Sequence, residues 1–130
     1  MKKGSFIRYL TLLLVSCALF WLHYHNNTLQ QDTEEGGSFN RGLTPLIYTR
    51  HARCRMGCRQ IDDSEVKEIL QEGKINYSKS DLNSKPDPKY ALEGKTHDDQ
   101  QVRIIFAPSK QGMVVITCID LNEEWDCNCN

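Results

Sequence analysis

Two pairs of cysteines, one near each end of the polar part of the chain, constrain its fold more than any other feature. Cys54 and Cys58 have a C-x3-C spacing, and Cys127 and Cys129 have a C-x-C spacing. A link within the C-x-C pair would be strained, so disulfides that join one pair to the other are the reasonable form. Such a link closes a loop of about seventy residues and would stabilise a small domain.

Zinc binding is an alternative use of the same sulfurs. Two close pairs of thiolates can bind zinc, although this spacing is not that of a standard zinc finger. Oxidising compartments favour disulfides, whereas the reducing cytoplasm favours metal or free thiols. Cys118 lies in an apolar run and is expected to be buried packing. The residues that would hold the metal are Cys54, Cys58, Cys127 and Cys129.

The N-terminal segment has the pattern of an export signal or a membrane anchor. Three cationic residues, Lys2, Lys3 and Arg8, precede an apolar run over residues 9–22. Counting residues 6–24 gives 19 residues, which predicts a transmembrane helix. Positive charge before the helix keeps the N-terminus in the cytoplasm, so the rest of the chain would face a periplasm-like space.

Two other interpretations of this segment stay open. The sequence LVSC at residues 14–17 resembles the lipoprotein box, in which Cys17 is lipidated after cleavage. The other interpretation is a cleaved signal peptide. Residues 25–45 lack periodicity and are rich in polar residues and glycine, which predicts a flexible linker. The predicted organisation is an anchor over 1–24, the linker over 25–45 and a domain over 46–130.

The domain is predicted to have an α+β fold, with two N-terminal helices packed on a small antiparallel sheet. Thr49 is the expected N-cap of a helix over 50–60. Asp62 and Glu65 form a D-x-x-E capping box for a second helix, which ends at Gly73. A short strand is expected within residues 74–80. Three runs of strand-like residues follow, at 89–95, 101–108 and 113–121, with turn residues between them.

The charge of the domain argues against a generic polyanion binder, although Arg50, Arg53, Arg55 and Arg59 form a local basic strip. Residues 46–130 contain 12 Lys and Arg and 14 Asp and Glu, a net charge of 12 − 14 = −2. On the first helix, His51, Arg55 and Arg59 share the rim where the helix meets the sheet. Histidine transfers protons and arginine binds phosphate, so these residues with Arg103 and Thr117 could cleave RNA. The same residues could instead simply cover apolar surface and pair with acids.

From Tyr48 onward the chain resembles a bacterial domain of unknown function, family 4258. The resemblance rests on YTRHARCRMGCRQIDDSEVKEIL, which contains the family pattern His-Ala-x-x-Arg-Met-x-x-Arg-x-Ile, and on the runs YALEG, QVRIIFAP and VVITCIDL. It implies a fold like that of the RelE and BrnT ribonuclease toxins, but no assigned activity. The cysteine set looks like that of a membrane-linked subgroup, which would favour a structural cross-link. The pattern positions are His51, Ala52, Arg55, Met56, Arg59 and Ile61.

Together these features predict a membrane-anchored α+β domain that acts as a binding or interaction module outside the cytoplasm. The expected partners are the membrane, through residues 6–24, and a protein. No cofactor is expected, unless the cysteines bind zinc. One alternative function is a RelE-like endoribonuclease or toxin-type enzyme, for which RNA is the partner, with His51, Arg55, Arg59 and Arg103 as the catalytic residues. Another is a zinc-binding protein that uses the cysteines.

Overall fold

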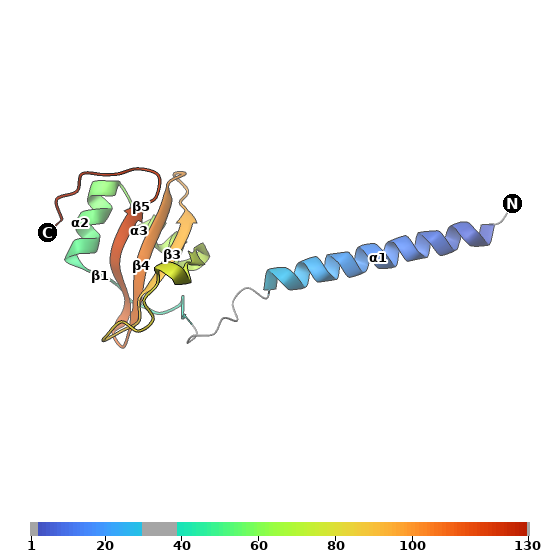
Figure 1. Cartoon of the computed structure of the whole chain (residues 1–130), viewed down its shortest axis with the longest axis horizontal. Helices are drawn as coiled ribbons and strands as arrows, with labels where there is room; N and C mark the ends of the chain where they lie inside the picture. The colour runs from blue at the N-terminus through green and yellow to red at the C-terminus, as the bar shows by residue number, and fades with distance from the viewer. Residues whose placement is uncertain (1–2, 30–38, 130) are drawn as a thin grey trace. The chain divides into compact units, whose positions relative to one another are not determined.

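The computed structural model describes residues 3–29 and 39–129. The chain divides into two compact units, Met1–Ser38 and Phe39–Asn130. The first unit contains helix α1 (Lys3–Leu29), and the second contains all the other elements described (Figure 1). Residues 30–38, which form the centre of the predicted linker, lie outside the described residues.

Helix α1 carries large apolar side chains that are exposed, with Leu12 at 66% and Phe20 at 73%. Nevertheless, no helix among the described residues is long and apolar enough to cross a membrane. The transmembrane helix predicted over residues 6–24 is therefore not found. The prediction counted Arg8 within the span, whereas the apolar run over residues 9–22 has 14 residues. A helical crossing needs about 20 such residues.

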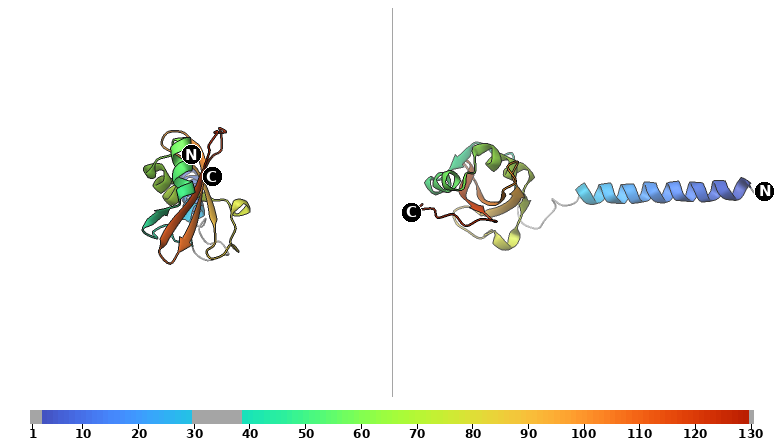
Figure 2. Two further views of the ribbon diagram at one scale, coloured as in Figure 1. Left: turned by 90° about the vertical axis from the view of Figure 1, so that its left-hand side faces the viewer. Right: turned by 90° about the horizontal axis from the view of Figure 1, so that it is seen from above.

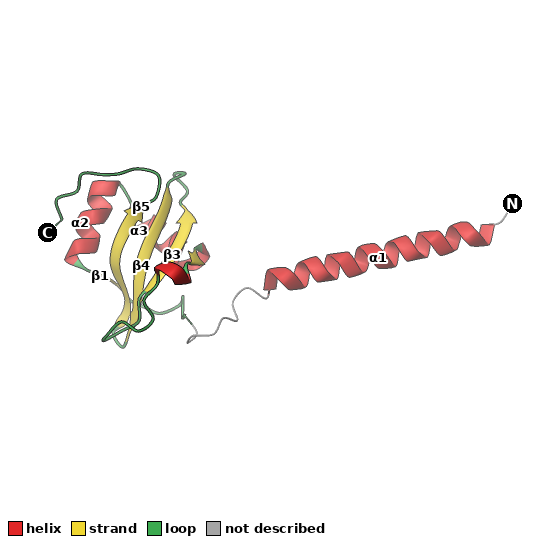
Figure 3. Cartoon of the chain, viewed as in Figure 1, coloured by secondary structure: helices red, strands yellow, loops and turns green. Residues whose placement is uncertain are grey.

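The folded unit is built on a five-stranded sheet with the strand order β1-β5-β4-β3-β2. Helices α2 (Arg50–Arg59) and α3 (Asp63–Glu72) cover one face of this curved sheet (Figure 2), and a short 3-10 helix, η1 (Tyr77–Lys79), follows β2 (Figure 3). The strands are β1 (Leu46–Tyr48), β2 (Lys74–Ile75), β3 (Tyr90–Lys95), β4 (Gln101–Ser109) and β5 (Gly112–Asp120).

The α+β class is confirmed, but the sheet is mixed rather than antiparallel as predicted. The difference is strand β1, which runs parallel to β5 with Leu46 opposite Met113. The other pairs, β5-β4, β4-β3 and β3-β2, are antiparallel. Three residues are too few to show an alternating pattern in the sequence, and the partner strand is distant, so β1 was not predicted. The predicted strand over 74–80 is also shorter, because it gives way to η1 after Ile75.

The core lies between the helices and the sheet. On β4, the buried side chains of Val102, Ile104 and Phe106 alternate with the half-buried ones of Arg103 and Ile105. Because successive side chains of a strand point to opposite faces, the buried set faces the helices and Arg103 lies on the other face. Helix α3 contributes a stripe of buried residues, namely Val66, Ile69 and Leu70.

The folded unit begins at Phe39, earlier than the predicted boundary at residue 46. The guanidinium of Arg41 donates to the carbonyls of Leu70 at 2.7 Å and Gly73 at 2.9 Å. These carbonyls lie at the C-terminal end of α3, where no backbone N–H of the helix is available to donate to them. The ring of Phe39 also contacts that of Tyr90, with centroids 4.7 Å apart. The polar composition of this segment concealed these contacts.

Both helix starts form as predicted. The Thr49 side chain accepts a hydrogen bond from the Ala52 backbone, and the capping box between Asp62 and Glu65 is present in both directions. Gly73 ends α3, but its φ is −62°, so left-handed geometry is not the reason for a glycine there. A Cβ on Gly73 would lie 2.5 Å from the carbonyl oxygen of Ile69, so close backbone approach is the reason.

We therefore expect opposite effects from two glycine-to-alanine substitutions. Gly73→Ala should lower the free energy of unfolding by about 1–3 kcal/mol, because the new methyl group meets backbone atoms that cannot rotate away. Gly57→Ala is the matched control, since a Cβ there has no heavy atom within 4 Å and the site is helical. It should raise stability by up to about 1 kcal/mol. Chemical denaturation measures both, and a stabilising Gly73→Ala would contradict this explanation.

Candidate functional site

The C-terminal tail, residues 121–129, is joined to helix α2 by two disulfides, Cys54–Cys129 and Cys58–Cys127. Their Cα atoms are 5.7 and 5.9 Å apart, respectively. The two helix cysteines are one turn apart, so an extended tail running in the opposite direction reaches both (Figure 1). The predicted linkage between the two cysteine pairs is confirmed, and the partners are now specified.

Two cysteines among the described residues are free thiols, Cys17 and Cys118. Cys118 is buried, as predicted, and burial raises the pKa of its thiol to about 12. Its thiolate form is therefore scarce at neutral pH. The zinc alternative requires four thiolates from residues that are bonded to one another here, and it stays a prediction for the reduced chain.

His51 is held by the tail rather than left open to a substrate. Its Nδ1 lies 3.0 Å from the carbonyl oxygen of Cys129. A carbonyl only accepts, so Nδ1 carries the proton in this contact. The other nitrogen, Nε2, accepts from Nε of Arg55 at 3.3 Å. The structure thus brings His51 and Arg55 together, as predicted, but both ring nitrogens already have partners.

Arg59 turns toward the sheet. Its Nη1 donates to the backbone carbonyl of Cys118 on β5, and its Nε is buried without a hydrogen-bond partner among the described residues. Burial, followed by the positive charge of Arg55, lowers the pKa of Arg59 from its usual value. The guanidinium stays protonated because an arginine pKa is so high. This geometry makes Arg59 a link between α2 and β5.

Arg103 does not join the other predicted catalytic residues. It lies on the sheet face opposite α2, where Nε contacts Oε1 of Glu93 at 2.6 Å. These two residues are register partners on neighbouring strands. Thr117 pairs with Ile105 and so shares that open face. The predicted set therefore divides into a helix pair, His51 and Arg55, and residues directed elsewhere.

The remaining pattern residues of α2 serve packing. Ala52 is fully buried, Ile61 is 3% exposed, and Met56 packs against the same core. Together with Arg59, these residues attach a mostly polar helix to the sheet. Each of these residues thus has a packing contact with the core.

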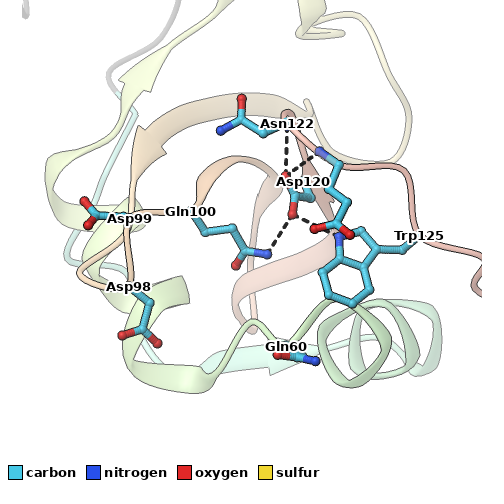
Figure 4. A pocket seen from close by; sticks show the side chains of 8 residues that line it. Gln60, Asp98, Asp99, Gln100, Asp120, Asn122 and Trp125 are labelled. Atoms are coloured by element: carbon cyan, nitrogen blue, oxygen red, sulfur yellow. Dashed lines mark hydrogen bonds between the residues drawn. The ribbon is translucent and has the colours of Figure 1, made fainter.

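An acidic hollow of about 380 Å³ lies at the end of the sheet, beside the C-terminus of α2 (Figure 4). Four of its lining residues are carboxylic acids, and none is Lys or Arg. Such a surface attracts cationic groups and repels phosphate. The lining residues are Gln60, Asp98, Asp99, Gln100, Asp120, Asn122, Glu123 and Trp125.

Asp120 organises this hollow. Its Oδ2 accepts from Nε2 of Gln100 at 2.8 Å and from Nε1 of Trp125 at 2.9 Å (Figure 4). Its Oδ1 accepts from the backbone of Asn122 at 2.9 Å and Glu123 at 3.1 Å. Partial burial opposes ionisation, but these hydrogen bonds outweigh it and lower the pKa of Asp120. The sequence predicts no site here, and its only signal for one is a Trp within an acidic tail.

Fold and site together define a small α+β domain whose tail is bridged to a helix on its mixed sheet. The chain belongs to the family described as Domain of unknown function (DUF4258), which matches residues 48–120. This segment runs from the last residue of β1 to the last residue of β5, so it includes Cys54 and Cys58 but not the tail cysteines. No curated protein and no solved structure matches the chain. The RelE-like fold therefore stays a prediction.

The two bridges should contribute to stability in a non-additive way. They span 75 and 69 residues, so either one closes nearly the same loop of the unfolded chain. We expect C54S/C129S or C58S/C127S to lower the free energy of unfolding by about 2 kcal/mol each, and the quadruple variant to lose about 6 kcal/mol. Denaturant titration of the three proteins measures this, with Cys17→Ser as the control. A quadruple loss equal to the sum of the two doubles would contradict the shared-loop explanation.

Proposed function

We propose that this protein is a non-catalytic binding module that works in an oxidising compartment outside the cytoplasm, close to a membrane. The observation that carries the proposal is the pair of disulfides between α2 and the tail. Disulfides persist in secreted and envelope proteins, whereas the cytoplasm keeps thiols reduced. A folded unit of this size also gains most from cross-links where they survive.

The apolar surface of α1 supports attachment to a membrane. Large side chains from Ile7 to Leu22 are exposed, and an exposed apolar surface of that kind needs lipid or a partner to cover it. We propose that the segment 6–24 contacts lipid, or that a lipid on Cys17 provides the attachment. In either arrangement we place the folded unit on the outer side of the membrane, because its disulfides would persist there.

Binding rather than catalysis is supported by how the predicted catalytic residues are used. Both ring nitrogens of His51 have partners, and Arg59 and Arg103 are occupied on different faces of the sheet. The acidic hollow offers a more open surface, with Trp125 beside four carboxylates. It suits a Lys or Arg side chain of a partner protein, because the ring and the acids both attract cations.

The redox state of the protein in the cell tests the proposed location. Cells expressing the full chain are quenched with acid, which traps the thiols in their current state. The protein is then denatured, and its free thiols are labelled with a maleimide polymer that slows migration in a gel. We expect at most two labels per chain, on Cys17 and Cys118, with the protein in the membrane fraction. A variant with Leu13→Asp and Leu14→Asp is the control, since charge in the apolar run should release the protein from membranes and leave all six cysteines reactive.

Six labels on the unaltered chain would overturn the proposed compartment. Recovery of the unaltered chain in the soluble fraction would overturn the membrane attachment, even if the cysteines were oxidised. The two parts of the proposal therefore fail separately.

An endoribonuclease is the second candidate, because His51 Nε2 and Arg55 Nε remain 3.3 Å apart on an exposed helix edge. The binding proposal predicts that purified oxidised protein leaves RNA intact. The ribonuclease alternative requires cleavage that is lost in His51→Ala and retained in His97→Ala, whose ring lies in the turn between β3 and β4. Gel analysis of a labelled RNA distinguishes the two outcomes.

A further inference from the structure

Three potential metal ligands meet where the start of α3 approaches the turn between β3 and β4. Glu65 lies in the first turn of α3, and His97 and Asp98 lie in the five-residue turn 96–100. One ligand atom from each residue lies within 4.8 Å of those from the other two. These residues are separate from the disulfides and from the histidine and arginines of α2, whereas Asp98 also lines the acidic hollow.

Glu65 is a buried carboxylate with an unused oxygen. Its exposed fraction is 1%, and its Oε2 accepts from the Asp62 backbone at 2.9 Å as part of the capping box. Its Oε1 is buried and has no hydrogen-bond partner among the described residues. Burying a carboxylate oxygen without a partner is costly, so a cation at this position would compensate a real deficit.

His97 is already oriented as a metal ligand would be. Its Nδ1 lies 2.9 Å from Oε2 of Glu68, which also accepts from the His97 backbone at 3.1 Å. Metal-binding histidines usually donate one ring nitrogen to a carboxylate in this way, which fixes the ring and leaves the other nitrogen for the metal. That other nitrogen, Nε2, lies 3.9 Å from Oδ1 of Asp98.

The surrounding charge also favours a cation. Asp62 and Glu68 place further carboxylates close to His97, in addition to the ligands Glu65 and Asp98. Lys67 and Lys95 each lie two residues from a ligand along the chain, and both are paired with other acids, Lys67 with Asp63 at 2.5 Å and Lys95 with Asp99 at 2.8 Å. A divalent cation would therefore enter a region of negative potential.

We propose that Glu65, His97 and Asp98 form a binding site for a divalent transition-metal cation of the zinc class, with Glu68 as a positioning residue. One imidazole and two carboxylates are a suitable donor set for zinc, with a fourth position left for water or for a partner's ligand. Ligands of tetrahedral zinc stand about 3.3 Å apart, so the group must contract by about 1.5 Å. The side chains of His97 and Asp98 are 51% and 72% exposed and are free to make that movement.

The bound metal would tie the β3–β4 turn to α3. This site shares Asp98 with the acidic hollow of the proposed function, but its metal binding is tested separately from the location and partner proposed there. It is independent of the thiolate alternative, because it uses no sulfur. The test of this site uses oxidised protein only so that cysteine thiolates do not compete for the metal.

A calorimetric titration of the full oxidised chain with zinc chloride tests the site. We expect one equivalent to bind, and Co²⁺ to bind in the same place without the charge-transfer absorption that sulfur ligands give. Glu65→Gln is the most informative variant, because Gln at this position also completes a capping box. It should keep the unfolding transition of the metal-free protein while weakening zinc binding at least tenfold.

Three further variants complete the test. His97→Ala should weaken binding at least tenfold, and Glu68→Gln should weaken it by about 10–100-fold through loss of ring orientation. Asp99→Asn is the matched control, since Asp99 is in the same turn but outside the ligand group, and its φ of 65° suits Asn. In Figure 4 its side chain points away from that of Asp98. This variant breaks only the exposed ion pair with Lys95, so it should bind zinc within about threefold of the unaltered chain.

The absence of zinc binding at millimolar concentration would overturn the proposal. So would equal affinity in Glu65→Gln, or a Co²⁺ spectrum with sulfur ligation. If Glu65→Gln proves unfolded, Asp98→Asn takes its place, and unchanged affinity in that exposed variant would overturn the proposal equally.

Discussion

The attachment of the tail to α2 is the interaction on which the rest of the folded unit depends. Helix α2 buries little apolar surface, since Ala52 is its one fully buried residue among those described and Met56 is partly buried. Hydrophobic burial of that size holds a ten-residue helix weakly. Two disulfides, the contact from Arg59 to the carbonyl of Cys118 and the Thr49 cap supply the remaining constraints. A polar helix can therefore pack on the sheet here. Without these links, α2 would need a larger apolar face to stay in place.

The same attachment decides what the residues of α2 can do. The tail brings the Cys129 carbonyl to His51, which leaves Arg55 as the partner of the second ring nitrogen. These two contacts hold the imidazole ring between the tail and the next turn of the helix. Charge is also divided over the domain, with arginines along α2 and carboxylates around the hollow at its end. The near-neutral total thus conceals two surfaces of opposite sign.

Local signals in the sequence predict α3, β4 and β5 well, because a capping box, an apolar stripe and β-branched runs act over a few residues. Strand β1 escapes such signals, since it is stable only beside β5. Arg103 was grouped with His51 because the face on which a strand residue lies depends on register, and its pairing with Glu93 places it on the other face. The cysteines could be matched across the two pairs, but the individual partners depend on the direction in which the tail crosses α2. The hollow around Asp120 combines a turn, a strand end and the tail, so no short stretch of sequence could reveal it.

Hydrogen bonds fix the backbone of the turn between β3 and β4, which contributes residues to both candidate surfaces. The Thr96 backbone donates to the Gln100 carbonyl at 2.9 Å, and the Asp99 backbone donates to Thr96 at 3.0 Å. The Gln100 side chain then joins the turn to the Arg59 carbonyl at 2.9 Å and to Asp120 at 2.8 Å. A turn fixed at both ends holds His97 and Asp98 near Glu65 without needing a ligand to order them. Binding groups supported in this way lose little entropy when they engage a cation, which is why this turn, rather than the arginine-rich helix, is the best-prepared surface of the domain.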